Sequence, residues 1–304
     1  MSRVTLLSGG VGGARAARGF AAVLAPDELT VIVNVGDDEQ IHGVHVSADL
    51  DTVVYTLAGV EGPQGWGRAD DTFTVMDALE RLGVDTTFRL GDVDLATCLA
   101  RTQALHAGES LSSITDRMAR TLGIQHRVVP ASDDALHTRV RTAQGDWLAF
   151  QEYFVLRGNR DEVAEVDFEG AEHAKPAPGV VEAIEEADLV VIAPSNPPLS
   201  IWPILAIREI HDAVLAAPRV VAVSPLFGGK ALKGPADRVM ASLGLPPGSA
   251  GVLTAYRALL SDLIVDQGDA DEEVDSGEVK IHALDTRIAD RDAAARFAAE
   301  VLAL

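Results

Sequence analysis

The sequence predicts an α/β fold built on a mostly parallel β-sheet, with helices on both faces and a small helical insertion. Short apolar runs rich in β-branched residues alternate with helical stretches, a pattern typical of a parallel sheet covered on both faces. Glycine-rich or polar loops directly follow these runs. The stretch 71–122 differs, because it has helical spacing and little strand signal.

The first elements are indicated near the N-terminus. Val4–Leu7 is a short apolar run, glycines follow at positions 9, 10, 12 and 13, and Ala14–Leu24 is rich in alanine. This order predicts a strand, a tight loop and a helix. Three further apolar runs have the composition of buried strands, namely Leu29–Val35, Leu189–Ala193 and Val220–Val223.

The remaining segments complete the predicted organisation. We expect residues 61–122 to be a helical insertion, and residues 1–60 with 123–304 to form the main domain. Alternating apolar and polar residues predict strands within 127–155. The acidic tract 266–278 is expected to be a solvent-exposed loop, and 289–302 a final helix that covers the sheet.

Composition excludes several classes of function. The chain has 304 residues, of which 47% are hydrophobic, so it can form a sizeable core and is not disordered. Its 46 acidic and 25 basic residues give a net charge of −21. Such a charge repels nucleic acid and anionic membrane surfaces, so we expect neither as a partner.

The single cysteine, Cys98, is expected to be a small buried residue of a helix. One cysteine excludes an intramolecular disulfide and a cysteine-based zinc site. No apolar run approaches the roughly 18 residues of a membrane span, and no convincing signal peptide is present. We therefore expect a protein of the reducing cytoplasm.

Four loops carry most of the residues that could perform chemistry. The glycine loop follows the first predicted strand, and 34–38, 194–197 and 224–230 follow the other three. Ligands of open α/β sheets bind outside the carboxyl ends of the strands. We therefore expect the four loops to converge on one crevice.

The glycine loop has the composition of a phosphate-binding loop. Without side chains, backbone N–H groups can approach a ligand, and the N-terminus of the following helix favours an anion. A tight strand–helix turn without a ligand is the alternative. Arg15 stands where a dinucleotide fingerprint needs its third glycine, which suggests a further phosphate contact. Lys230 is followed by Ala231, which cannot bind Mg²⁺, so the chain has no Walker-type P-loop.

Two acidic clusters follow the second predicted strand. Asp37 and Asp38 stand at its expected end, and Asp49 and Asp51 follow shortly after. Asp49 or Asp51 alone could cap a helix. Two such clusters beside a phosphate-binding loop instead predict a divalent cation, because like charges this close repel each other and Mg²⁺ prefers oxygen ligands.

Other candidate residues have plainer alternatives. Arg89 could make a bidentate contact with a carbonyl or phosphate group, or be an ordinary surface arginine. Asp92 could cap the helix that begins near Val93. Ser195 lies in the sequence Pro-Ser-Asn-Pro and not in a nucleophile elbow, so a Ser–His–Asp hydrolase is not expected.

In combination, the motifs resemble the 2-phospho-L-lactate transferase family of coenzyme F420 biosynthesis. The resemblance covers nearly the whole chain in order. It rests on GGVGGAR at 9–15, NVGDD at 34–38, DLDT at 49–52, LGDVDLAT at 90–97, PSNP at 194–197 and GGK at 228–230.

The resemblance implies a Rossmann-like fold and a specific reaction. Members of the family join a three-carbon acid, activated as a guanosine-diphosphate-linked donor, to 7,8-didemethyl-8-hydroxy-5-deazariboflavin, and release GMP. The reaction requires Mg²⁺, and the acid is lactate or, in many bacteria, enolpyruvate. The GGVGGAR loop resembles bacterial members, which favours the enolpyruvyl donor. The resemblance also implies a homodimer.

The resemblance further implies roles for individual residues. Asp51 and Arg89 match positions that bind the deazaflavin, and Asp51 could orient or deprotonate the attacking hydroxyl. Asp37 and Asp38 match an acidic site suited to Mg²⁺, and Asp37 is thereby a candidate catalytic residue. The remaining substrate contacts are implied for Gly9, Gly10, Gly12, Gly13, Arg15, Ser195, Asn196 and Lys230.

Two other functions are compatible with the same fold. The first is a nicotinamide-dependent oxidoreductase, although Arg15 in place of the third glycine argues against it. The second is a non-catalytic regulator that binds nucleotide sugars, because distant relatives of this family share the glycine loop.

Overall fold

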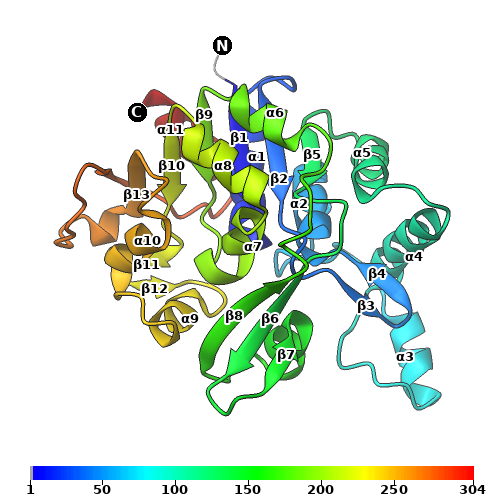
Figure 1. Cartoon of the computed structure of the whole chain (residues 1–304). Helices are drawn as coiled ribbons and strands as arrows, with labels where there is room; N and C mark the ends of the chain where they lie inside the picture. Colours follow the sequence, from blue (N-terminus) through cyan, green and yellow to red (C-terminus); the bar gives the residue numbers. More distant parts are fainter. Residues whose placement is uncertain (1–2) are drawn as a thin grey trace.

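The computed structural model describes residues 3–304 and contains a seven-stranded sheet in which every neighbouring pair is parallel (Figure 1). The strand order is β14-β13-β10-β9-β1-β2-β5. This confirms the predicted α/β fold. The strands are β1 (Val4–Ser8), β2 (Leu29–Val33), β5 (Arg127–Pro130), β9 (Leu189–Ile192), β10 (Val220–Val223), β13 (Asp262–Asp266) and β14 (Lys280–Leu284).

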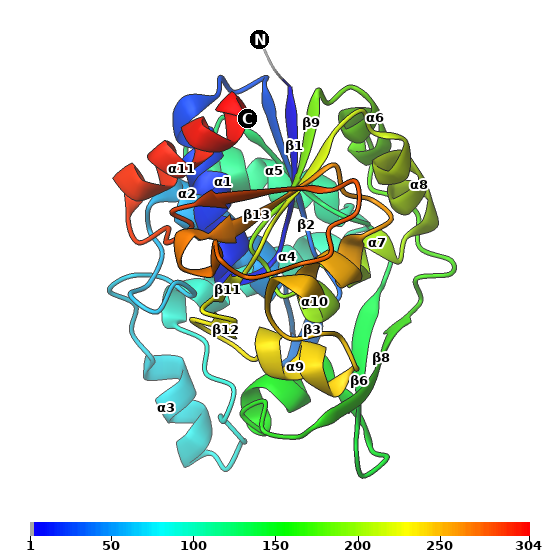
Figure 2. The ribbon, with the colours of Figure 1, turned by 90° about the vertical axis from the view of Figure 1, so that its left-hand side faces the viewer.

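The sheet is covered by helices on both faces. Every residue of β1, β9 and β10 is buried, which explains why these strands are continuous apolar runs. One face carries α1 (Gly10–Val23), α2 (Ala48–Ala58) and α11 (Arg291–Ala303), and the other carries α6 (Val180–Glu185), α7 (Trp202–Leu205) and α8 (Arg208–Ala216) (Figure 2). The expected final helix is therefore confirmed. Within residues 3–304, no helix is long and apolar enough to cross a membrane.

The predicted insertion contains three helices and has its own small core. The helices are α3 (Thr74–Arg81), α4 (Asp92–His106) and α5 (Leu111–Thr121). The hairpin β3 (Glu39–Ile41) and β4 (Val44–Val46) packs on α4. Cys98 is fully buried in this core, beside Met76 and Leu90, as a small apolar residue.

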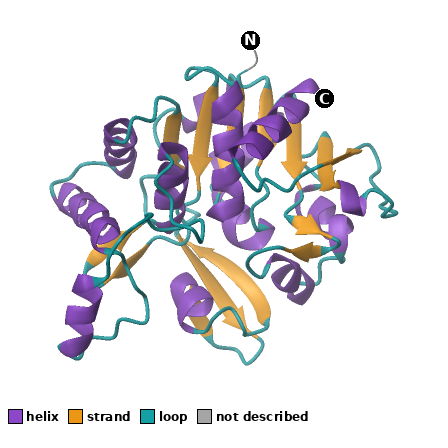
Figure 3. Ribbon diagram, turned by 180° about the vertical axis from the view of Figure 1, so that it is seen from behind, coloured by secondary structure: helices purple, strands orange, loops and turns teal. Residues whose placement is uncertain are grey.

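A second, antiparallel sheet lies below the main one (Figure 3). It consists of β7 (Trp147–Ala149), β6 (His137–Thr142) and β8 (Val163–Glu169). The strands predicted within 127–155 therefore belong to two sheets, because β5 joins the main sheet while β6 and β7 belong to the antiparallel sheet. The C-terminal part also holds β11 (Leu226–Phe227), β12 (Lys230–Ala231), α9 (Ala236–Ser242) and α10 (Gly248–Tyr256).

The strand order reverses direction at the centre of the main sheet. From β1 the chain proceeds to β2 and β5 on one side, whereas β9, β10, β13 and β14 follow on the other. Such a switch point opens a crevice outside the carboxyl ends of the two central strands. The ends of β1 and β9 are therefore where a ligand site is expected in this fold.

Candidate active site

The glycine loop meets the loop after β9 at this switch point. The Gly9 N–H donates to Ser195 Oγ at 3.2 Å, and the Ser195 hydroxyl donates to the Gly9 carbonyl oxygen at 2.7 Å. Ser195 is buried. Two of the four predicted loops are therefore joined directly, and Ser195 acts as the link between them.

The glycines of this loop are required for different reasons. A Cβ on Gly12 would lie 2.2 Å from the Pro194 carbonyl oxygen, and one on Gly13 would lie 2.4 Å from Ser8 Oγ. These two glycines let α1 approach the β9 loop closely. Gly10 has a φ of 61° and open space around it. Of the four glycines in this loop, only Gly10 has a positive φ, and no neighbouring atom occupies the space where its Cβ would lie.

The acidic residues of two predicted clusters gather beside this loop. Asp37, Asp38 and Asp49, here called the acidic triad, are each about 5% exposed. The Asn34 side-chain amide donates to Asp37 Oδ1 and Asp49 Oδ2, both at 3.0 Å. The Gly10 N–H donates to Asp49 Oδ1 at 2.7 Å. Asp49 therefore connects the triad to the glycine loop.

Burial and mutual repulsion shape the titration of the triad. Burial, with the charges of Asp49 and Asp38, raises the pKa of Asp37 well above its ordinary value. Burial also raises the pKa of Asp49 to about 6, although hydrogen bonds from Asn34 and Gly10 partly offset this effect. The triad thus concentrates negative charge that a nearby cation would stabilise.

Asp38 has one oxygen engaged and one without a partner. Its Oδ2 accepts from the Ser47 hydroxyl at 2.7 Å and contacts His45 Nε2 at 3.1 Å. Its Oδ1 is buried and has no hydrogen-bond partner within residues 3–304. An unpartnered buried carboxylate oxygen beside two further carboxylates fits the oxygen ligand set of a divalent cation. Gln151 donates to the Asp37 carbonyl oxygen at 2.9 Å.

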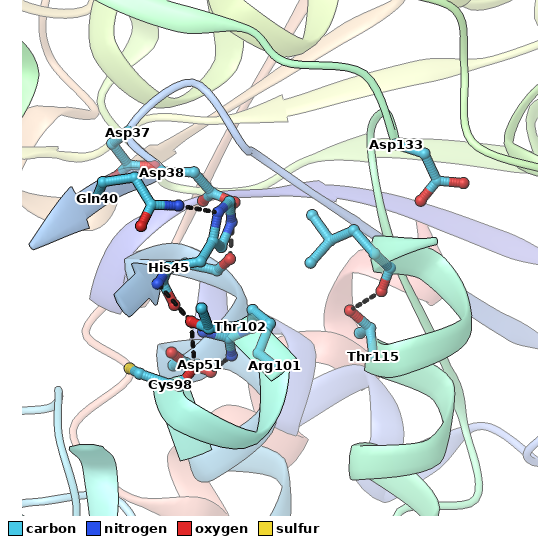
Figure 4. Close-up of polar contacts among 12 residues, drawn as sticks. Asp37, Asp38, Gln40, His45, Asp51, Cys98, Arg101, Thr102, Thr115 and Asp133 are labelled. Carbon is cyan, nitrogen blue, oxygen red and sulfur yellow. Dashed lines mark hydrogen bonds and ion pairs between the residues drawn. The ribbon is translucent and has the colours of Figure 1, made fainter. Parts of the chain in front are cut away.

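Asp51 contacts the helical insertion instead of the triad. It forms a buried ion pair with Arg101 of α4, and Arg101 also donates to the His45 carbonyl oxygen at 3.2 Å (Figure 4). The Arg101 side chain is 2% exposed. This ion pair connects α2 to α4 and determines the position of the Asp51 carboxylate.

Asp94 and Cys98 lie close to Asp51. One ligand atom from each of these three residues lies within 4.8 Å of the others, a grouping that could hold a metal. However, Arg101 already supplies a positive charge to Asp51, and the Tyr55 hydroxyl donates to Asp94 Oδ1 at 2.8 Å. We interpret the group as a buried polar network. The spacing of 94, 98 and 101 along one helix face is the sequence signal that could have identified it.

The other expected site residues are more dispersed. Arg89 pairs with Asp77 and lies over the Phe73 ring at 5.3 Å, and within residues 3–304 it forms no hydrogen bond or ion pair with Asp51. Asn196 accepts from the Leu199 N–H at 3.4 Å and caps the following helical turn. Arg15 and Lys230 are away from these contacts: Arg15 donates to the Ile288 carbonyl oxygen at 3.4 Å, and Lys230 is exposed on β12.

Comparison with known proteins finds related sequences over nearly the whole chain. Residues 4–302 match the sequence model of the family described as 2-phospho-L-lactate transferase CofD. The chain is 42% identical to a phosphoenolpyruvate transferase of Kitasatospora aureofaciens, over 99% of this chain and 97% of that protein. It is also 42% identical to a 2-phospho-L-lactate transferase of Methanopyrus kandleri, over 99% and 96%.

Solved structures extend the comparison to the fold alone. Protein BH3568 from Bacillus halodurans, described as a member of the UPF0052 family, superposes with a TM-score of 0.64 at 16% identity. The match covers 99% of both chains. At this identity, it supports the shared architecture and carries no argument about function.

Proposed function

Because the chain belongs to the 2-phospho-L-lactate transferase CofD family, we propose that it performs the family's group transfer in coenzyme F420 biosynthesis. It transfers a phosphoenolpyruvyl or 2-phospho-L-lactyl group from a guanosine-diphosphate-linked donor to 7,8-didemethyl-8-hydroxy-5-deazariboflavin. GMP is the leaving group. The reaction takes place in the cytoplasm.

One observation supports this proposal most strongly. Asp49 accepts the Gly10 N–H at 2.7 Å and shares the Asn34 amide with Asp37. The acidic triad and the phosphate-binding loop are therefore parts of one site at the switch point. Transfer of a phosphoryl group depends mainly on positioning and on neutralising charge, which such a site can supply.

The acidic triad has the donors for Mg²⁺. Asp37, Asp38 and Asp49 supply hard oxygen ligands, and Asp38 Oδ1 is buried without a partner among residues 3–304. When bound, Mg²⁺ would offset the negative charge of the diphosphate and of the triad. We expect Asp49 to be as important as Asp37 and Asp38, which were the residues expected from the sequence.

Residues of this chain bind the donor and accept the proton of the attacking hydroxyl. The N–H groups in the first turn of α1 that do not donate to Ser195 or Asp49 bind the diphosphate, and Ser195 and Asn196 contact the guanosine nucleotide. Lys230, which is exposed on β12, adds positive charge. The terminal ribityl hydroxyl forms a bond to the distal phosphorus as the bond to GMP breaks. Asp51 takes the hydroxyl proton, a role that suits a carboxylate whose pKa is raised by burial.

The donor acid is the finer part of the proposal. The chain is 42% identical both to a phosphoenolpyruvate transferase and to a 2-phospho-L-lactate transferase. Overall identity therefore favours neither donor. The GGVGGAR loop at 9–15 resembles bacterial members, so we propose the enolpyruvyl donor.

The decisive experiment supplies both donors. Purified protein is mixed with the deazariboflavin, Mg²⁺ and either guanosine-diphosphate-linked enolpyruvate or guanosine-diphosphate-linked lactate, and mass spectrometry identifies the adduct. We expect the enolpyruvyl product and GMP. Formation of the lactyl product alone would correct the donor, and no adduct with either donor would refute the transferase.

A matched pair of variants tests the site itself. Asp49→Asn should lower kcat by about a hundredfold or more, since it removes one carboxylate from the triad. Asp27→Asn, which changes an exposed aspartate at the start of the chain, should leave kcat unchanged. Equal activity of the two variants would show that the triad is not the reaction site.

The two alternative functions receive no support from the known relatives reported above. These relatives are transferases and match nearly the whole chain. This favours group transfer over a nicotinamide-dependent oxidoreductase or a regulator that binds nucleotide sugars.

A further inference from the structure

A cavity outside the reaction site gathers positive charge on a strongly acidic protein. It lies between the first two turns of α1, the end of α2, the loop 61–65 and the start of α11, and its volume is about 310 Å³. Arg15, Arg18 and Arg291 line it. The chain has a net charge of −21, so three guanidinium groups around one cavity stand out against the rest of the surface.

The charges of these arginines are only partly balanced. Arg18 pairs with Glu61 at 2.5 Å, yet its Nε is buried without a hydrogen-bond partner within residues 3–304. Among residues 3–304, no Asp or Glu carboxylate lies within ion-pair distance of Arg15 or Arg291. Asp290, the other acidic residue of the lining, caps α11 by accepting the Ala293 N–H at 2.8 Å. The cavity therefore retains positive charge and unused donors.

The end of α2 leaves room for Arg291 beside the cavity. Gly59 ends α2 with a φ of 70°, a conformation that favours glycine. A Cβ at Gly59 would lie 2.1 Å from Arg291 Nη2. The end of α2 therefore carries no side chain at the point where the Arg291 guanidinium passes it. The absence of a side chain at Gly59 leaves room for the Arg291 guanidinium beside the cavity.

The lining also indicates the kind of ligand. Guanidinium groups bind phosphate through paired N–H donors, which suits a phosphate monoester. Val11, Pro63 and Ala289 add apolar surface beside the arginines. The volume of about 310 Å³ exceeds the size of a phosphate ion and matches the lower end of small-molecule pockets.

We propose that this cavity is a second binding site, which holds a small organic phosphate separately from the acidic triad. Arg15 and Arg291 bind the phosphate group, and Arg18, which pairs with Glu61, adds positive charge to the lining. The phosphate contact that the sequence predicts for Arg15 is then made here. Val11 directly follows Gly10, so the occupant would contact the helix turn that supports the glycine loop. The inference does not depend on the transferase reaction.

Calorimetry on the full chain tests the proposal, with EDTA present so that no Mg²⁺ can recruit phosphate to the triad. Phosphoenolpyruvate is the probe, inorganic phosphate is the smaller anion, and pyruvate is the same acid without phosphate. We expect saturable binding of phosphoenolpyruvate at one site per chain, weaker binding of inorganic phosphate, and none of pyruvate. No saturable binding, or equal binding of pyruvate, would overturn the proposal.

Variants locate the binding. Arg15→Gln and Arg291→Gln should each raise the Kd for phosphoenolpyruvate about tenfold or more, the loss expected for one charged hydrogen-bonding contact. Arg296→Gln, on the exposed side of α11, should leave the Kd unchanged. Unfolding midpoints show whether each variant is folded, and Arg291 is exposed enough to be replaced safely.

A last variant separates this cavity from the reaction site. Asp49→Asn alters the triad but no residue of the cavity, so it should leave the Kd for phosphoenolpyruvate unchanged. If binding responds to Asp49→Asn and not to Arg291→Gln, the phosphate lies in the reaction site and the second site does not exist. If the unaltered protein binds phosphoenolpyruvate at this cavity but has no transferase activity, that result counts only against the proposed function.

Discussion

At the scale of single residues, Asp94 shows how the burial of a carboxyl group makes the stability of the protein depend on pH. Burial, reinforced by the charge of Asp51, raises the pKa of Asp94 from 3.8 to about 6. The folded protein therefore holds this proton more tightly than the unfolded chain. Stability contributed by this group is present below about pH 4 and is lost as the pH rises through 6.

The variant Asp94→Asn should flatten this pH dependence. Asparagine cannot ionise, yet its carbonyl oxygen can still accept the hydrogen bond from Tyr55. We expect the variant to gain stability relative to the wild type between pH 4 and pH 7.5, measured as the free energy of unfolding in urea. Parallel curves for the two proteins would contradict the prediction, and Asp27→Asn is the control.

The Asp51–Arg101 pair gives a second prediction at this scale. Arg101→Met leaves the Asp51 carboxylate buried without its cation, which should lower the free energy of unfolding by about 3–5 kcal/mol. The double variant with Asp51→Asn removes the uncompensated charge and should recover part of the loss. Urea unfolding of the two single variants and the double variant measures this coupling. A double variant as unstable as the sum of the singles would show that the two side chains act independently.

At the scale of elements, the junction between β1 and α1 depends on where α1 approaches the β9 loop. Gly12→Ala places a Cβ 2.2 Å from the Pro194 carbonyl oxygen, so the helix must move away from the sheet. Gly10→Ala meets no neighbour and has only the strain of a positive φ, about 1–2 kcal/mol. We expect Gly12→Ala to be the more destabilising variant in urea unfolding. The opposite order would show that α1 does not approach the β9 loop so closely.

The elements also show which parts of the fold are visible in the sequence. The central strands are predictable because they are buried on both faces, whereas β8 is mostly exposed or partly buried and lacks an apolar run. The convergence of the glycine loop, Ser195 and the aspartates follows from the sheet. Arg101 could not be predicted as the partner of Asp51, because the pair joins α2 to α4 across fifty positions in the sequence.

At the scale of the whole molecule, the homodimer stays a prediction. Light scattering coupled to size-exclusion chromatography should give about twice the mass of the 32.0 kDa chain. The measurement needs more than one protein concentration, because a weak dimer dissociates on dilution. A mass equal to that of one chain throughout would refute the homodimer.

The net charge also governs how the whole molecule meets its anionic donor. A charge of −21 repels a nucleotide diphosphate at long range, while the attraction that we propose is local and comes from the glycine loop, Lys230 and Mg²⁺ at the acidic triad. Salt screens the long-range repulsion more than the contacts inside the crevice. At constant free Mg²⁺, KM for the donor should therefore fall as ionic strength rises from about 0.01 to 0.15 M. A KM that rises over this range would mean that the positive groups of the crevice dominate even at a distance, against the net charge of the chain.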